Sequence, residues 1–283
     1  MRLVSASGGQ VPTHQMLLDR ALVIWGLDSI MQESGNVFRT GKYHKSFKKK
    51  HIHLVRKAQL RVFYSTSSQF ITNLGWCDPL SKKAPQILLC GTASPYTTVT
   101  FVRFVRKRSL TASLDVLDIS PYSLSQSESV LRTCRDIDRT KVSFVEGDAL
   151  AMPFSDGYFD WIETDFFIQF FSAEEKITIF KEWYRVLKPG GIVTTRDWLL
   201  QRQDFIERVV DRTKNWLIRH ILGPIAYSAS SQEVKETLSN IGFEVAVFPV
   251  RVPVIKLKIP VMSYILMCKP SITSFQTNAP VNR

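Results

Sequence analysis

The sequence lacks any long uninterrupted apolar run. None of its apolar stretches approaches 18 consecutive residues, although 45% of its 283 residues are hydrophobic. Because a helix needs about 20 apolar residues to cross a bilayer, we expect no membrane span. The composition instead predicts a folded globular protein with a substantial core. The first eleven residues lack a secretory apolar core, so we expect a cytoplasmic protein; their serine-bearing, acid-free composition leaves a transit peptide as an alternative.

Cysteines are scarce, and no two of them lie close in sequence. None belongs to a CxxC pair or to a spacing suited to zinc; they are Cys77, Cys90, Cys134 and Cys268. This pattern favours free thiols in a reducing compartment. His51 and His53 have no cysteine or acidic partner beside them, so we expect solvated helix residues and no metal site.

Acidic residues are absent between Glu33 and Asp78, while nine of the 37 basic residues fall there. The other 28 basic residues nearly balance the 25 acidic ones, so the net charge of +12 belongs mainly to this segment. Three interpretations are open. The segment forms a solvated face, it meets an anionic substrate or membrane surface, or it holds RNA. No recognised nucleic-acid motif supports the third.

Three regions follow from the pattern of the chain. Residues 1–84 form a helical basic N-terminal extension or lid, with helices expected over residues 13–33 and 49–74, before the linker "GWCDPLSKKAP". Residues 85–270 alternate short apolar runs with amphipathic stretches, which is typical of an α/β domain with a mostly parallel sheet. Residues 271–283 form a tail.

The expected strands of this domain cover residues 86–90, 113–118, 142–146, 159–164 and 192–197. The expected helices lie near residues 96–107, 123–134 and 173–187, the last one stopping at "KPGG". A further helix over 232–241 should end at Gly242, before strands near 243–250 and 261–269. Two strands without a helix between them predict an antiparallel pair at the end of the sheet.

Carboxylates follow two of the predicted strands. In an open α/β sheet, ligands bind over the carboxyl ends of the strands. Asp118, followed by Ile119, could accept hydrogen bonds from two ribose hydroxyls. Asp148 could accept the exocyclic amine of an adenine, and Ala149 leaves room for the ring. Asp118 alone would also suit an NAD-binding fold, or it could be a solvated strand-end residue.

Three ordered motifs resemble the class I S-adenosylmethionine-dependent methyltransferases, in the small-molecule branch that includes the quinone-biosynthesis methyltransferases. They are "LDVLDISPYSL", "FVEGDALAMPFSDGYFDWI" and "KEWYRVLKPGGIV", within residues 114–197. The resemblance implies a Rossmann-like sheet of seven strands whose final strand is antiparallel, with S-adenosyl-L-methionine as cofactor. It also implies cofactor contacts from the residues Gly91, Thr92, Ala93, Asp118, Ile119, Asp148, Ala149 and Thr164.

The loop after the first strand departs from this family. The family has an aspartate followed by a G-x-G-x-G loop, where this chain has Leu89, Gly91, Ala93 and Pro95. Glycine lets the backbone approach the cofactor without a Cβ in the way. The adenosine half of the site therefore looks intact and the methionine half altered. Hydroxyls of Thr92, Ser94 and Thr97 could compensate.

Methyl transfer needs alignment and exclusion of water more than a fixed catalytic motif. The resemblance places Thr164, Asp165 and Phe166 beside the methyl group. Asp165 is the first candidate to act on an acceptor, although a helix-capping role competes with it; Asp197 and His220 are more distant candidates. Phe166, Phe167, Phe170 and Phe171 could line an acceptor pocket or a core stripe.

We expect a small-molecule acceptor. A non-methylating relative of the fold, an RNA methyltransferase and an NAD-dependent enzyme are the alternatives.

Overall fold

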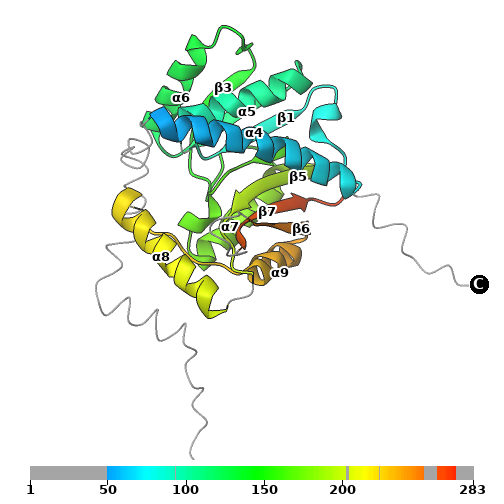
Figure 1. Cartoon of the computed structure of the whole chain (residues 1–283). Helices are drawn as coiled ribbons and strands as arrows, with labels where there is room; N and C mark the ends of the chain where they lie inside the picture. Colours follow the sequence, from blue (N-terminus) through cyan, green and yellow to red (C-terminus); the bar gives the residue numbers. More distant parts are fainter. Residues whose placement is uncertain (1–49, 93, 202–203, 223, 252–259, 272–283) are drawn as a thin grey trace, which may run out of the picture.

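The computed structural model describes residues 50–92, 94–201, 204–222, 224–251 and 260–271 (Figure 1). The helix expected over residues 13–33, residues 34–49 of the basic segment, Ala93 and most of the C-terminal tail lie outside these residues. Within the described part, no helix is both long and apolar enough to cross a membrane.

One seven-stranded sheet forms the centre of the protein, in the order β3-β2-β1-β4-β5-β7-β6. The strands are β1 (Gln86–Cys90), β2 (Ser113–Asp118), β3 (Val142–Glu146), β4 (Phe159–Glu163), β5 (Leu187–Asp197), β6 (Glu244–Arg251) and β7 (Pro260–Cys268). The first five run parallel, and β7 pairs antiparallel with both β5 and β6. The predicted fold class is confirmed, including the antiparallel pair at the end.

The start of β5 differs from the prediction. The stretch "KPGG" was expected to be a turn before the strand, but the strand begins already at Leu187. Its register to β4 shifts between Phe159 and Trp161, which pair with Leu187 and Ile192. Gly190 has a φ of +73°, a conformation that glycine adopts readily. The proline and glycines therefore make a bulge inside the strand.

Helices cover both faces of the sheet (Figure 1). They are α4 (Lys50–Asn73), α5 (Pro95–Arg108), α6 (Pro121–Thr133), α7 (Ala173–Val186), α8 (Phe205–Leu222) and α9 (Ser231–Ile241), with short 3-10 helices η2 (Pro79–Ser81) and η3 (Ile168–Phe170). Serine side chains cap the N-termini of four of them, Ser94, Ser120, Ser172 and Ser230. Gly242 ends α9 with a φ of +113°, as predicted from the sequence.

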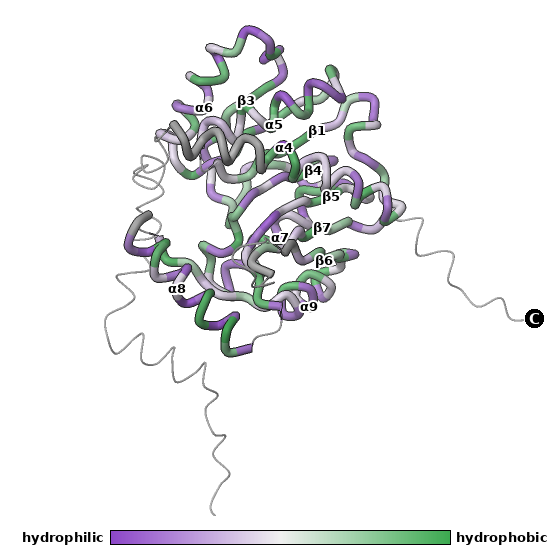
Figure 2. The backbone as a smooth tube through the Cα atoms, viewed as in Figure 1, coloured by the Kyte–Doolittle hydropathy of each residue, from purple (hydrophilic) through white to green (hydrophobic). Residues whose placement is uncertain are grey.

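The core has two halves, one on each face of the sheet. One joins the sheet to α4, α5 and α6; the other joins it to α7 and α9. Alternate residues of β1 enter different halves, Leu89 the first and Leu88 the second. The runs of high hydropathy accordingly follow the central strands (Figure 2).

Helix α4 belongs to this core, although it lies within the predicted extension. Its residues Leu60, Phe63, Tyr64 and Ile71 are at most 2% exposed. The following linker is also anchored. Lys82 Nζ lies 2.7 Å from Asp160 Oδ1, and Lys188 Nζ lies 2.7 Å from the other oxygen. The described part of residues 1–84 thus packs on the sheet, while the domain boundary itself stays a prediction.

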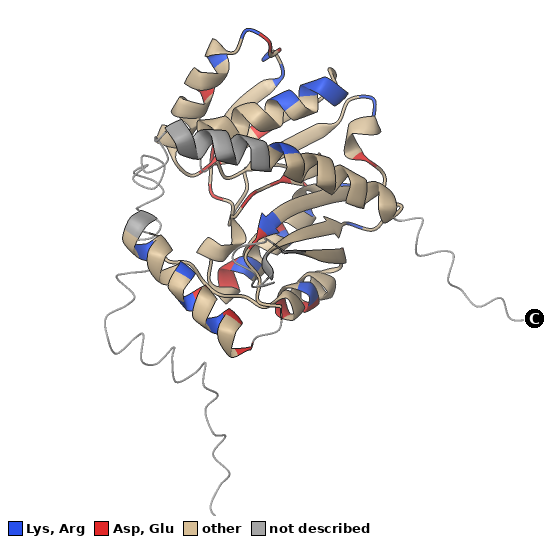
Figure 3. Ribbon diagram, in the orientation of Figure 1, with Lys and Arg blue, Asp and Glu red and all other residues tan. Residues whose placement is uncertain are grey.

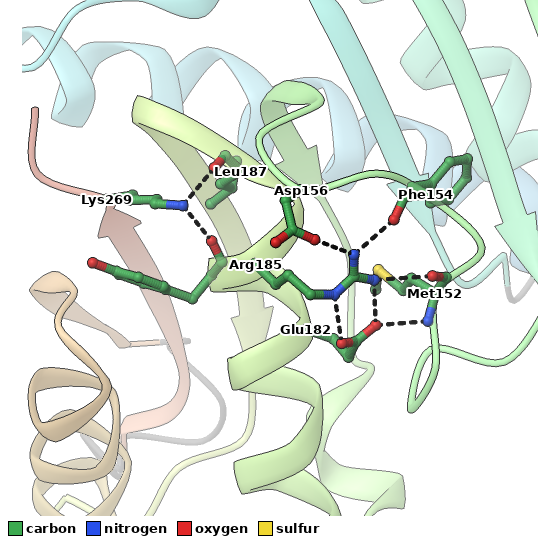
Figure 4. A network of polar contacts seen from close by, with 8 residues as sticks. Met152, Phe154, Asp156, Glu182, Arg185, Leu187 and Lys269 are labelled. Atoms are coloured by element: carbon green, nitrogen blue, oxygen red, sulfur yellow. Dashed lines mark hydrogen bonds and ion pairs between the residues drawn. The ribbon is translucent and has the colours of Figure 1, made fainter.

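An arginine hub fixes the loop between β3 and β4 (Figure 4). The Arg185 guanidinium donates to Glu182, to Asp156 and to the carbonyl oxygens of Met152 and Phe154. These carboxylates, Glu182 first, raise the pKa of Arg185. The "RVLKPGG" motif is therefore structural.

Candidate functional site

The carboxyl ends of β1, β2 and β3 meet at one edge of the sheet, and acidic residues lie in the loops there (Figure 3). Gly91 N donates to Leu117 O over 2.8 Å, and Gly147 N donates to Asp118 O over 3.1 Å. These bonds hold the three strand ends together. Residues that were predicted from separate motifs therefore lie at one site.

Asp118 is the best-fixed carboxylate of this edge. It is 6% exposed. Its Oδ2 accepts the Thr92 N–H at 2.7 Å and the Thr92 hydroxyl at 3.0 Å, and its Oδ1 accepts the Ser120 N–H at 2.9 Å. The predicted loop residue Thr92 and the predicted ribose ligand Asp118 thus orient one another. Ile119, half-buried, follows at the strand end.

Asp148 stands at the end of the neighbouring strand β3. Its Oδ1 accepts the Leu150 N–H at 2.9 Å, which closes a tight turn. Ala149 is 8% exposed, so this small side chain packs beneath the turn. Two adjacent strand ends therefore carry carboxylates, an arrangement that suits a nucleoside with its hydroxyls and amine.

Gly91 has a φ of +76° and lies directly against the ring of Phe167. A Cβ at this position would lie 2.6 Å from two ring carbons, so the position requires glycine for both space and backbone conformation. Phe167 packs further on Phe171 and Trp183, with ring centroids 4.8 and 6.5 Å apart. Phe167 thus forms an aromatic wall beside the loop.

Asp165 lies in a buried ion pair. Arg196 Nε donates to Asp165 Oδ1 over 2.7 Å, and the two side chains are 3% and 2% exposed. The Arg196 guanidinium lies between the rings of Phe63 and Phe166, 5.0 and 4.9 Å from their centroids. Phe166 has a φ of 52°, which non-glycine residues rarely adopt. Such backbone strain gathers at functional sites.

The other two predicted candidates, Asp197 and His220, differ in burial. Asp197 is fully buried and accepts the N–H groups of Trp198 and Gln169, while His220 is exposed on α8. Burial raises the pKa of Asp197 to about 6, against the backbone N–H groups and the nearby Lys214 and Lys176, which lower it. Within the described residues, no cluster of three or more His, Cys, Asp or Glu side chains could hold a metal ion.

Two features of this edge were missed by sequence reasoning. Helix α8 was not predicted, and it turns charged residues inward: Glu207, Asp211 and Lys214 are buried, while Phe205 is 80% exposed. Lys214 Nζ lies 2.8 Å from Asp211 Oδ1 and 5.1 Å from the ring centroid of Trp198. Glu163 is the second feature, a carboxyl inside a strand whose five residues are all buried.

The site also holds buried polar atoms with no hydrogen-bond partner in the described structure. They include Thr164 Oγ1, Thr195 Oγ1 and Glu163 Oε1, all at the carboxyl ends of β4 and β5. Buried polar groups are nearly always paired in a complete assembly. With the carboxylates of Asp118 and Asp148, these atoms fit a polar ligand with both hydroxyl and amino groups.

Comparison with known proteins agrees with this geometry. Residues 96–195 match the family described as "Methyltransferase domain". The chain is 31% identical over 85 residues to the chloroplastic 2-phytyl-1,4-beta-naphthoquinone methyltransferase of Arabidopsis thaliana, covering 30% of each protein. It is 41% identical over 70 residues to the ubiquinone/menaquinone biosynthesis C-methyltransferase of Yersinia enterocolitica, covering 23% of this chain and 27% of that protein. The chain therefore matches less than a third of the length of these relatives.

Solved structures share the fold. A SAM-dependent methyltransferase of Methanosarcina mazei superposes with a TM-score of 0.51 at 17% identity, over 69% of this chain and 99% of that one. The geranyl diphosphate C-methyltransferase of Streptomyces coelicolor A3(2) superposes with a TM-score of 0.51 at 13% identity. This superposition covers 74% of this chain and 77% of that one. These comparisons show that residues 96–195 match a methyltransferase domain and that the described part of the chain has the fold of these solved methyltransferases.

Proposed function

We propose that this protein binds S-adenosyl-L-methionine and transfers its methyl group to an oxygen, nitrogen or carbon atom of a small metabolite. The single observation that carries the proposal is the pair of adjacent strand-end carboxylates, Asp118 and Asp148, within the matched domain. Asp118 would hold the ribose hydroxyls and Asp148 the adenine amine. Gly91 and Thr92, with Ala93, would form the loop beneath the methionine moiety.

The cofactor brings the leaving group itself, because the methyl carbon is bound to a sulfonium. The protein therefore has to bind, align and exclude water. Thr164, at the end of β4, has a buried hydroxyl without a partner in the described structure and could bind the cofactor. Phe167 would form a wall of the site beside Gly91.

Asp165 is proposed to orient the site instead of accepting a proton. Its carboxylate is the ion-pair partner of the buried Arg196 guanidinium, and loss of that partner would leave an uncompensated buried charge. The ion pair also fixes Phe166, whose N–H donates to Arg196 O over 2.8 Å. A base is needed only for an acceptor that is protonated at neutral pH.

The acceptor is proposed to be apolar or aromatic. The named relatives are a naphthoquinone methyltransferase, a C-methyltransferase of ubiquinone/menaquinone biosynthesis and a geranyl diphosphate C-methyltransferase. In this chain, Phe167 lies against Gly91 and Phe166 lies against Arg196, and both rings could contact such a molecule.

Calorimetric titration with S-adenosylmethionine and S-adenosylhomocysteine tests the cofactor. We expect binding of both ligands and a loss of about tenfold or more in affinity for each of Asp118→Ala and Asp148→Ala, because each removes a charged hydrogen-bond acceptor. Asp156→Ala, which removes an exposed carboxylate of the Arg185 hub, is the matched control. Unchanged affinity in both site variants would contradict the proposal, and the absence of heat from the wild type would favour a non-methylating relative of the fold.

A further inference from the structure

A buried carboxyl lies at the point where the strand order reverses. The chain builds β1, β2 and β3 in one direction and then crosses to β4 on the other side of β1. In open α/β sheets the ligand crevice lies at this switch point, above the carboxyl ends of the strands. Glu163 is the last residue of β4, and it pairs with Leu89 of β1.

The Glu163 carboxyl is held by one oxygen only. Its Oε2 accepts the hydroxyl of Thr194, its register partner on β5. Thr194 is oriented in turn by Trp161 Nε1, which donates to its hydroxyl over 2.6 Å. The other oxygen, Oε1, is buried and has no hydrogen-bond partner within the described structure. A ligand donor would satisfy it.

The charges around Glu163 favour a cationic donor. Burial chiefly, with the nearby Asp165 carboxylate, raises the pKa of Glu163 well above its ordinary value. The Arg196 guanidinium lowers the pKa of Glu163, but it is itself paired with Asp165 and lies over two aromatic rings. An arriving cation would therefore be stabilised by Glu163 in its ionised form.

We propose that Glu163 accepts a hydrogen bond, through Oε1, from the α-ammonium group of the cofactor's methionine moiety. This inference rests on the proposed function. A carboxylate and an ammonium form a strong charge-assisted hydrogen bond. The position opposite Glu163 on β1 is Leu89, which is fully buried and apolar. Neighbouring strands lie about 4.8 Å apart, so the Glu163 carboxyl lies close to the end of β1.

Two ligands separate this contact from the rest of the site. S-adenosylhomocysteine has the α-ammonium group, whereas 5′-methylthioadenosine has the same adenosine and thioether without the amino acid. In calorimetry, we expect Glu163→Gln to lower the affinity for S-adenosylhomocysteine about tenfold or more. The affinity for 5′-methylthioadenosine should be unchanged. Asp115→Asn is the matched control, since Asp115 is another sheet carboxyl whose pKa is raised, chiefly by burial.

A shorter carboxylate gives a second variant. If Glu163→Gln does not fold, Glu163→Asp takes its place, because it keeps the charge but draws the carboxyl back from the ligand. We expect Glu163→Asp to lower the affinity for S-adenosylhomocysteine and to leave the affinity for 5′-methylthioadenosine unchanged.

The inference is overturned if a folded Glu163→Gln or Glu163→Asp variant binds both ligands like the wild type. Failure of the proposed function looks different, because the wild type would then bind neither ligand.

Discussion

The buried carboxyl groups at the carboxyl edge of the sheet differ in the hydrogen bonds that they receive from the protein. Asp118 is buried but receives three protein donors. Glu163 and Asp197 are fully buried, and burial raises the pKa of each. Buried carboxyl groups at the same edge of the sheet therefore have different surroundings, because they have different hydrogen-bond partners.

The raised pKa of Asp197 predicts how the stability of the folded protein depends on pH. Its folded-state pKa of about 6 exceeds the ordinary value of 3.8, so the folded protein binds this proton more tightly than the unfolded chain. Its contribution to stability is fully present below about pH 4 and is lost as the pH rises to about 6.

Replacing Asp197 by asparagine should remove this pH dependence of stability. The expected change is about 3 kcal/mol in the free energy of unfolding between about pH 4 and pH 6, because a pKa shift of one unit corresponds to about 1.4 kcal/mol. The measurement is urea unfolding from pH 4 to pH 7. Asp156→Asn, which changes an exposed carboxylate, should keep the slope. A variant with the wild-type slope would contradict the assignment.

At the scale of elements, α4 is the most informative helix. Sequence composition marked it as part of a basic extension, but the structure packs Phe63 into the core, stacked on Tyr264 with ring centroids 5.1 Å apart. The same ring lies against Arg196, which pairs with Asp165. Helix α4 therefore links the core to the site.

Two neighbouring residues of α4 test this role. Phe63 is fully buried and Val62 is 62% exposed. We expect Phe63→Ala to lower the free energy of unfolding by about 3 to 5 kcal/mol, from lost packing and a cavity. Val62→Ala should change it by no more than about 0.5 kcal/mol. Equal effects in denaturant titrations would show that α4 does not support the core.

At the scale of the whole molecule, the fold brings the ends of β1 to β5 to one edge, where a ligand would contact several elements at once. Binding to the folded state alone adds stability by mass action. We therefore expect S-adenosylhomocysteine, at 100 times its Kd, to stabilise the protein by about 2.7 kcal/mol.

The melting temperature should then rise by several degrees, which differential scanning fluorimetry can measure. NADH at the same concentration is the control and should cause no shift. A shift with NADH and none with S-adenosylhomocysteine would support a dinucleotide-binding function instead.

Much of the architecture could be predicted from the sequence. The bounds of β1, β2 and β3 agree with the structure residue for residue, and α9 ends at Gly242 as expected. These features depend on short-range signals: apolar runs, capping serines and a glycine after a helix. Helix α8 was missed because three of its charged residues, Glu207, Asp211 and Lys214, are buried. Several of its apolar residues are exposed, among them Phe205 and Trp216, which departs from the usual pattern.

By itself, the sequence determined the order of the described strands and of the described α-helices except α8, the family resemblance and the carboxylates Asp118 and Asp148, since each of these depends on neighbours along the chain. Only the tertiary structure decided that Phe167 covers Gly91, that Arg196 pairs with Asp165 and that Glu163 stands opposite Leu89. These contacts join residues far apart in sequence, and they exist only because strand register and packing bring the side chains together.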